Sequence, residues 1–409
     1  MLTHPYTKYC AYLLILVYVY FETAQHQDFD IFLAASTDYL HGENIFAHSY
    51  ESGFHFFYSP LFAAMLIPFT FLPIHVSRII WLLLNIFALT RCFKLLKRYF
   101  DFDKFSKRQK LFFDVFLLVF SAKLILDNFH NGQVTIFMLL FMLEGLRLIK
   151  SGNPLWGAAL IALGINFKFL PLVLLPYLFY NKQLKACVYI VMWYAVFLFL
   201  PALIHGWQQN QQLLKDWFAS INPSNKQHLI DTDETTLNGL TTLIPTLLME
   251  KVPDMYALPI KRNILNLDVN TVTMIINIVR LLLVVFVLYF IRRKIFTQAK
   301  TKLQELWELS YVFLLIPLIF PHQQHYAFFL MLPASMYVIY TCFYTKIKGQ
   351  KNAVTIIVLM VLVFLLTNAH LLLGEFREYY DHYKIITYGA LLMAGLLAYL
   401  RPSVVINEK

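Results

Sequence analysis

Charged side chains are scarce in this sequence. Only 14% of the 409 residues are Asp, Glu, Lys or Arg, whereas 59% are hydrophobic, and the mean hydropathy is +0.59. These values lie outside the range of soluble globular proteins and are typical of a polytopic membrane protein. The net charge of +10 does not indicate a nucleic-acid partner, because the basic residues form short clusters between apolar runs, as membrane topology and anionic lipid headgroups require.

Cysteines and the common catalytic motifs are also scarce. The sequence has no CxxC and no paired cysteine spacing, so neither a disulfide framework nor a zinc site is indicated. The four cysteines are Cys10, Cys92, Cys187 and Cys342. GxGxxG, Walker A and GxSxG motifs are absent, which leaves nucleotide-driven and serine-hydrolase chemistry without support. We therefore expect no metal and no cofactor.

Apolar runs dominate what is present, and a membrane-spanning helix needs about 20 mostly apolar residues. The runs that qualify or nearly qualify cover residues 9–22, 74–94, 109–127, 132–149, 185–204, 271–291, 308–320, 325–344, 352–373 and 384–400. Residues 153–181 are too long for one span, and Gly164, Lys168 and Pro171 interrupt them, which predicts two short helices that turn back at the break. Residues 58–73 are short and bounded by prolines, which favours a helix that lies in the interface or re-enters it.

Four basic clusters set the topology. They follow residues 90, 180, 290 and 343, and the positive-inside rule places each of them in the cytoplasm. They agree with one another if the N-terminus is inside, residues 58–73 do not cross and residues 153–181 cross twice. The sequence therefore predicts an all-α bundle of about twelve spans in one domain, residues 1–409, with both termini inside and the first run retained as a signal anchor.

Most of the unusual polar residues then lie on the outer face, in loops that include residues 22–73 and 205–270. We expect function on that face, in an integral protein of a bacterial inner membrane. Residues 28–40 show helical spacing of apolar side chains, which predicts an amphipathic helix on the outer membrane surface. Asp28 begins this helix, where its carboxylate has two interpretations: an N-cap, or a catalytic base at the interface.

The outer turn "DNFHNGQVT" concentrates hydrogen-bonding side chains at an apolar rim. Its candidates for binding a sugar or an acceptor are Asp127, His130, Asn131 and Gln133. Such groups suit sugar hydroxyls. The alternative is a solvated turn, since Asn-Gly is a common turn pair.

Several basic side chains are also candidates for a functional role. Lys168 interrupts two apolar helices near the outer boundary, where it either snorkels to the headgroups or contacts a phosphate. His322 and His325, three residues apart, have no third metal ligand and are expected to contact phosphate or sugar. Arg280, deep in a predicted span, needs a partner in the bundle and is either structural or a second phosphate cation.

The order of several segments resembles glycosyltransferase family 87, whose members are polytopic enzymes of the GT-C fold and include polyprenyl-phosphate-mannose-dependent mannosyltransferases. The similar segments are "DFDIFLAAS", "YSPLFAAMLIPFTFLP", "NGQVTIFMLLF", "GAALIALGINFKFLPLVLLPYLF", "TTLNGL" and "PHQQHYAFFLMLP", over roughly residues 25–340. The family's acidic residue before an aromatic matches Asp28 and Phe29, and Asp30 is a second candidate. The family's Tyr-Pro-Pro-Leu element is "YSPL" here, with Ser59 replacing the first proline and Pro60 retained.

The resemblance assigns further site residues. The family's Asn-Gly-Gln turn matches residues 131–133, its lysine between two short helices matches Lys168, and "TTLNGL" adds Asn238 as a sugar or acceptor contact. In the histidine segment this chain has two glutamines where the family has a small residue or Trp, so His325 matches better than His322.

The activity that the resemblance implies is an inverting transfer of a hexose, with mannose as a guess, from a polyprenyl-phosphate sugar to a hydroxyl of a lipid or glycan acceptor. Asp28 would act as base, while Lys168, His325, His322 and Arg280 would hold the donor phosphate among membrane lipids. A transporter or flippase of a lipid-linked saccharide is the alternative, and a structural envelope subunit a third. A transporter would place ionisable residues at mid-depth, where the candidates are Arg280, Asp114 and Glu144.

Overall fold

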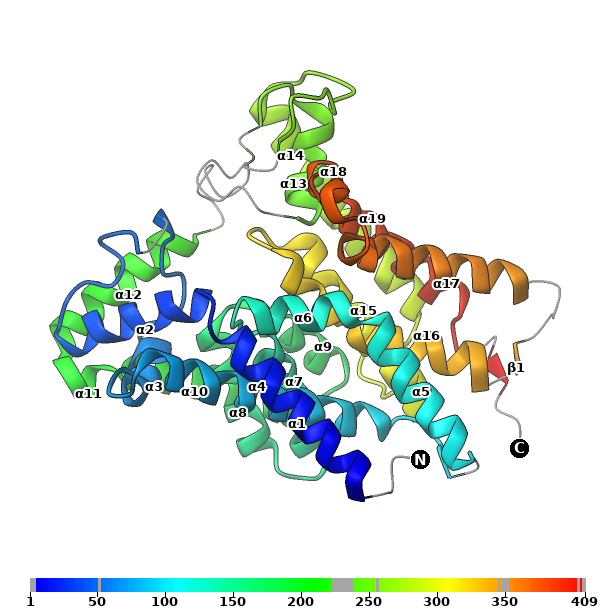
Figure 1. Ribbon diagram of the computed structural model, residues 1–409, viewed down its shortest axis with the longest axis horizontal. Coiled ribbons are helices and arrows are strands. Elements are labelled where there is room, and N and C mark those ends of the chain that lie inside the picture. Colours follow the sequence, from blue (N-terminus) through cyan, green and yellow to red (C-terminus); the bar gives the residue numbers. More distant parts are fainter. Residues whose placement is uncertain are drawn as a thin grey trace. The chain divides into compact units, whose positions relative to one another are not determined.

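The computed structural model describes residues 5–50, 53–103, 105–222, 238–252, 254, 257–344, 346–347, 353–402 and 405–406. In these residues the fold is all-α, as predicted (Figure 1), except for two short strands. Strand β1 (Lys346–Ile347) pairs antiparallel with β2 (Val405–Ile406).

Five segments in the described part of the chain are long and apolar enough to cross a membrane. They are α4 (Ile74–Lys97), α10 (Leu184–Phe199) with α11 (Ala202–His205), α14 (Val269–Ile291), η4 (His325–Met331) with α16 (Leu332–Tyr344), and α17 (Ala353–Asn368) with η6 (Ala369–Leu371). A sixth is possible if α6 (Ala122–His130) and α7 (Thr135–Lys150), which are bent by 114°, form one broken span. The chain is thus a polytopic all-α membrane protein, and the twelve crossings stay a prediction.

Further helices lie both at predicted positions and in segments that the sequence analysis treated as outer loops. They are α1 (Pro5–Glu22), α2 (Asp28–Leu40), α3 (Pro60–Thr70), α5 (Lys107–Phe120), α8 (Pro154–Phe167), η2 (Leu170–Val173), α9 (Leu174–Tyr180), α12 (Trp207–Ile221), α13 (Leu240–Leu248), α15 (Lys302–Ile319), η7 (Gly374–Phe376), α18 (Arg377–His382) and α19 (Ile385–Tyr399). Those in the outer loops are α12, α13, η7 and α18. The predicted break in residues 153–181 is confirmed, because extended Lys168 ends α8 and α9 follows after one 3₁₀ turn.

The contacts divide the chain into two compact units. Unit 1 comprises Met1–Phe93, Leu126–Pro171 and Tyr189–Ile221, and unit 2 comprises Lys94–Ile125, Leu172–Val188 and Asn222–Lys409. Asp28 and Lys168 belong to unit 1, whereas His325 belongs to unit 2. The single domain expected over residues 1–409 stays a prediction.

In unit 1, α2 packs on α3, and α3 in turn contacts α8 and α12 (Figure 1). Ser59 starts α3 as its N-cap, with its hydroxyl accepting from the Phe62 N–H at 3.3 Å, so the serine that replaces a family proline has a structural use. Helices α7 and α8 approach so closely that a Cβ on Gly157 would lie 2.5 Å from the Gly145 carbonyl oxygen. Larger side chains at these two positions would separate the helices.

In unit 2, α15 is the central element and is buried along nearly its whole length. It contacts α16, η4 and α19. Polar groups inside this core are paired: the Trp307 indole N–H donates to the Leu397 carbonyl at 2.8 Å, and the Tyr311 hydroxyl donates to the Ala394 carbonyl at 3.1 Å. These bonds fix α15 against α19 because an unpaired buried donor costs stability.

Candidate functional site

The first turn of α2 carries both carboxylates of the predicted amphipathic helix. Gln27 occupies the N-cap with an extended backbone, and its N–H donates to Oδ2 of Asp30 at 3.0 Å. Asp28 is the first residue of the helix, so its interpretation as an N-cap is wrong. Because Gln27 and Asp30 perform the capping, the carboxylate of Asp28 is left for other contacts.

Asp28 is held by a residue of the Asn-Gly-Gln turn. The side-chain amide of Gln133 donates from Nε2 to Oδ2 of Asp28, and its Oε1 accepts from the Tyr58 hydroxyl at 3.2 Å. An amide nitrogen only donates and an amide oxygen only accepts. Tyr58 therefore fixes the orientation in which Gln133 faces Asp28.

The surroundings of Asp28 change its proton affinity. Burial raises the pKa of this carboxyl to about 6, although the hydrogen bond from Gln133 and the positive charge of Lys168 act in the opposite direction, as does His130 to a smaller extent. The side chain is nevertheless partly accessible. We call Asp28, Gln133, Tyr58 and Lys168 the acidic centre; its carboxylate can accept a proton near neutral pH.

Asp30, the second candidate base, has structural partners. The Arg78 guanidinium donates from Nε to Oδ1 at 2.8 Å and from Nη2 to Oδ2 at 2.6 Å. Arg78 is 4% exposed and also donates to the Thr23 carbonyl at 3.2 Å. This bidentate ion pair neutralises the negative charge of Asp30 and joins α2 to α4.

The Asn-Gly-Gln turn packs directly against the start of α2. Gly132 has φ +58°, and a Cβ there would lie 2.9 Å from the Cβ of Phe29, so both backbone conformation and space require glycine. Its carbonyl accepts from the Trp81 indole N–H at 2.6 Å, and the Trp81 ring stacks on Phe29 at 4.8 Å between centroids. These contacts hold Gln133 next to Asp28.

The other residues predicted in this turn have local partners. Asn131 donates from Nδ2 to the backbone carbonyl of Asp127 at 2.8 Å. His130 lies 2.9 Å from a carboxylate oxygen of Glu22, and its side chain is 57% exposed. The turn is therefore held by local contacts, and Gln133 is the side chain through which it hydrogen-bonds Asp28.

Unit 2 has a second cluster, which we call the histidine centre and define as His325, His370 and Asp381. Nε2 of His325 lies 3.1 Å from Oδ1 of Asp381, and Nε2 of His370 lies 3.3 Å from Oδ2. Burial alone raises the pKa of Asp381, but the hydrogen bonds and charges of the two imidazoles outweigh it and hold the pKa well below the usual range of an aspartate. Asp381 therefore stays ionised and orients His325.

Asn238 lies beside the histidine segment in unit 2. It forms an antiparallel bridge with Gln323, in which its N–H donates to the Gln323 carbonyl at 2.7 Å. His322 has a left-handed backbone with φ 54° and precedes this bridge directly. The structure thus brings Asn238 next to the residues that the resemblance had selected.

Arg280 is not part of either cluster in the described residues. It contacts Asn277 on its own helix, with Nη1 3.3 Å from the amide oxygen, and none of the carboxylates in the described part of the chain forms an ion pair with it. The partner that the sequence predicted for Arg280 is therefore absent from the described bundle. Within the same residues, His, Cys, Asp and Glu form no group of three that could hold a metal ion.

Four residues of these clusters escaped the sequence analysis: Tyr58, Arg78, His370 and Asp381. Tyr58 lies in the "YSPL" element, and Asp381 lies between the predicted spans 352–373 and 384–400, but neither position indicates a partner. Tyr58 and Gln133 are 75 positions apart, and Arg78 and Asp30 are 48 apart, whereas Asp381 is only 11 positions from His370 but far in sequence from His325. Only packing reveals these pairs.

Comparison with known proteins identifies the family. The model of glycosyltransferase family 87 matches residues 56–321, well over half of the chain. The matched region includes Gln133, Lys168 and Asn238, whereas Asp28 precedes it and His325 follows it. No curated protein matches the chain. Because the family model covers most of the sequence, and the resemblance of its motifs agrees, this chain belongs to glycosyltransferase family 87.

Proposed function

We propose that this membrane glycosyltransferase moves a hexose from a polyprenyl-phosphate donor to a hydroxyl of a lipid or glycan acceptor, with Asp28 as the base. In this proposal the enzyme is a GT-C bundle of twelve spans in a bacterial inner membrane, α2 lies on its outer face, and the reaction inverts the configuration at C1. Mannose is the first sugar to test. The donor itself supplies the leaving group, so no cofactor is needed.

The chemistry follows from a displacement at C1 of the sugar. The acceptor oxygen bonds to C1, the bond from C1 to the phosphate oxygen breaks, and the phosphate leaves with the bonding electrons. Asp28 takes the proton of the acceptor hydroxyl. A pKa of about 6 suits this role, because the carboxylate is ionised at pH 7 and binds a proton more readily than an ordinary aspartate.

Lys168 is the proposed phosphate contact of the acidic centre. Its positive charge affects Asp28, which supports their proximity. It also sits where α8 ends and the backbone is extended. A cation there would stabilise the charge that develops on the leaving phosphate. His325, with His322 and Arg280, remains a proposed donor contact in unit 2, and Asp127, His130, Asn131, Gln133 and Asn238 remain proposed sugar or acceptor contacts.

One observation carries the proposal: in a chain of a glycosyltransferase family, a partly accessible carboxylate with a raised pKa is held by an oriented amide in the field of a lysine. Asp30 is a weaker choice because Arg78 and the helix cap occupy both its oxygens. Transport is disfavoured as well. Of its mid-depth candidates, Glu144 pairs with Arg91 and Arg147, and Asp114 pairs with Lys97.

The test uses detergent-purified protein, radiolabelled polyprenyl-phosphate mannose and a lipid extract as acceptor, with polyprenyl-phosphate glucose in a parallel reaction. Covalent transfer without a sealed membrane supports an enzyme. Asp28→Asn should abolish it, whereas Asp38→Asn, which removes an equal charge from the same helix, should not. Asp38 interacts with His48, at 3.1 Å, and with Tyr50, and neither of these residues belongs to the acidic centre. Normal turnover of Asp28→Asn would refute the assignment of the base.

A further inference from the structure

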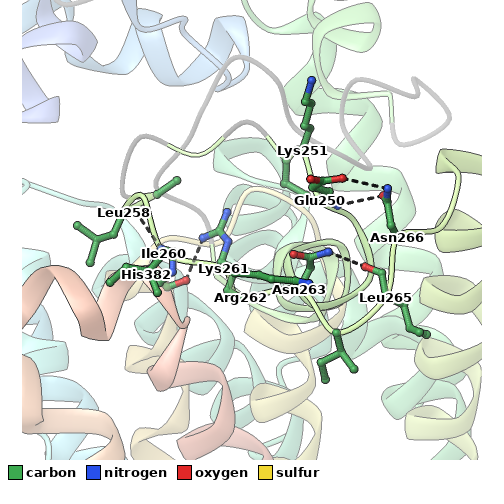
Figure 2. A pocket seen from close by; sticks show the side chains of 13 residues that line it. Glu250, Lys251, Leu258, Ile260, Lys261, Arg262, Asn263, Leu265, Asn266 and His382 are labelled. Atoms are coloured by element: carbon green, nitrogen blue, oxygen red, sulfur yellow. Dashed lines mark hydrogen bonds between the residues drawn. The ribbon is translucent and has the colours of Figure 1, made fainter.

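A pocket of about 940 Å³ lies in unit 2, away in sequence from every predicted site residue. The segment after α13 forms this pocket by folding back on the end of the helix. The Ile264 N–H donates a hydrogen bond to the Leu247 carbonyl at 2.7 Å, and the Leu267 N–H donates to the Leu248 carbonyl at 2.8 Å. Figure 2 shows its polar lining, which includes Glu250, Lys251, Lys261, Arg262, Asn266 and His382. We call this cavity the loop pocket.

Buried positive charge lies at the pocket. Asp254 pairs with two cations, Nη1 of Arg262 at 2.5 Å and Nζ of Lys384 at 2.8 Å. The side chains of Asp254 and Lys384 are 1% exposed and that of Arg262 is 10% exposed. One carboxylate thus faces two buried cations. An uncompensated buried charge is costly, and a bound anion would remove that cost.

The acidic residue of the lining does not cancel this charge. The carboxylate of Glu250 accepts a hydrogen bond from Nδ2 of Asn266 at 3.2 Å, and the amide oxygen of Asn266 accepts one from the Glu250 N–H at the same distance (Figure 2). This pair of hydrogen bonds stabilises the loop. Lys251 and Lys261 are exposed, and neither has a recorded partner in the described residues. The lining and the buried residues next to it therefore hold four cations, Lys251, Lys261, Arg262 and Lys384, against three carboxylates, Glu250, Asp254 and Asp381, the last of which acts on Lys384.

The ring of His382 lines the pocket without adding charge. Its Nδ1 accepts from the Leu258 N–H at 3.0 Å, so in the neutral ring the proton is on Nε2. Burial, followed by the nearby charge of Arg262, lowers its pKa, although a hydrogen bond with the backbone of Ile260 acts in the opposite direction. The ring is therefore neutral at pH 7, and the Arg262 guanidinium donates from Nη1 to the His382 carbonyl at 2.9 Å.

The rim of the pocket combines cations with exposed apolar side chains. Ile264 is 76% exposed, Leu265 51% and Ile260 42%. These three residues and Lys261 lie within five positions of the chain. A basic pocket next to exposed aliphatic side chains matches a ligand that has an anionic head and an apolar tail.

We propose that the loop pocket binds a phosphate ester, seated on Arg262 with Lys251 and Lys261 around it and the apolar part of the ligand along Ile264 and Leu265. The phosphate of an anionic lipid headgroup and that of a soluble phosphate compound share this chemistry. None of the residues proposed for the transfer lines the loop pocket, although His382 of its lining directly follows Asp381 of the histidine centre. The binding test does not depend on turnover. The cations of the loop pocket suit phosphate because guanidinium and ammonium groups form strong charge-assisted hydrogen bonds with it.

The test measures binding to the purified full-length protein in a zwitterionic detergent. Two probes are titrated separately, short-chain phosphatidylglycerol and inorganic phosphate, and the shift in unfolding temperature gives the Kd of each. The test variant is Lys251→Ala with Lys261→Ala. The matched control is Lys300→Ala with Lys302→Ala, which removes the same charge from exposed positions of unit 2. All four lysines are exposed, so unfolding temperatures without ligand should equal that of the wild type.

The expected result is saturable binding of phosphatidylglycerol that weakens about thirtyfold in the test variant and less than about twofold in the control, since two lysines near an anionic headgroup together contribute about 2 kcal/mol. Inorganic phosphate that binds as tightly as the lipid and shows the same loss would support a soluble phosphate ligand. Binding of neither probe, or an equal loss in both variants, would overturn the proposal. Charge reversal in Lys261→Glu must weaken binding further.

Discussion

The acidic centre of unit 1 and the histidine centre of unit 2 each hold one aspartate, and burial acts on both in the same direction. Their partners differ. Asp28 faces the neutral amide of Gln133, and its pKa is raised to about 6, whereas Asp381 faces two imidazoles that hold its pKa below the usual range. Partner chemistry, rather than burial, decides which carboxylate can exchange a proton and which is a permanent anion.

The largest expected effect is that of Asp28→Asn, with a loss of transfer of about 10²- to 10⁴-fold, the usual contribution of general-base catalysis. The same variant should be more stable. The folded pKa of Asp28 is above its unfolded value, so its ionised form at pH 7.5 costs the fold up to about 3 kcal/mol, and this cost disappears as the pH falls below 4. Unfolding temperatures at pH 7.5 and pH 4 measure the difference, and a lower value for the variant at pH 7.5 would contradict it.

Asp381→Asn should have the opposite effect on stability. The folded pKa of Asp381 is depressed, so the carboxylate stabilises the fold above its unfolded pKa, and this stability is lost as the pH falls. Hydrogen bonds to a charged group contribute about 1.5–3 kcal/mol each, so the variant should unfold at a lower temperature at pH 7.5. Thermal unfolding of the matched pair Asp28→Asn and Asp381→Asn is the direct comparison. If both substitutions shifted the unfolding temperature at pH 7.5 in the same direction, the contrast between the two aspartates would be wrong.

A smaller effect should follow Gln133→Ala. The amide of Gln133 favours the ionised form of Asp28. Its removal should therefore shift the rising limb of the pH profile of kcat/KM from about pH 6 to higher pH, by about one pH unit. The loss would then be about tenfold at pH 5.5 and small at pH 8. The control is Asn131→Ala, whose side chain bonds the Asp127 carbonyl rather than Asp28. An unchanged limb in Gln133→Ala would show that the amide does not act on Asp28.

The smallest expected effect is that of Tyr58→Phe. Without its hydroxyl, the Gln133 amide can rotate and present its oxygen to Asp28, which disfavours the carboxylate. We expect the limb to shift in the same direction as in Gln133→Ala but by less, with about a two- to threefold loss at pH 6. Tyr58→Phe in the Gln133→Ala background should then add nothing. An additive effect would mean that Tyr58 acts by another route.

Local features of this fold follow from the sequence, and distant pairs do not. The helix at residues 28–40 and the break at Lys168 follow from spacing, proline and charge, because these act within one or two helical turns. The family motifs selected Asp28 and Gln133 as separate site residues, and only the structure shows the hydrogen bond between them. The pairing of Asp30 with Arg78 had no signal, since a buried ion pair needs two helices to pack in one register. The pairing of Asp381 with His325 could not be predicted for the same reason.

The Tyr58–Gln133 orientation also gives the carboxylate of Asp28 two unequal oxygens. Oδ2 is occupied by an amide N–H, so a proton placed there would oppose that donor. In the proposed reaction Oδ1 is therefore the favoured oxygen for the incoming proton, and we expect the acceptor hydroxyl to arrive from that side. Tyr58, which is not one of the proposed sugar contacts, would thereby influence the direction from which the new glycosidic bond is made.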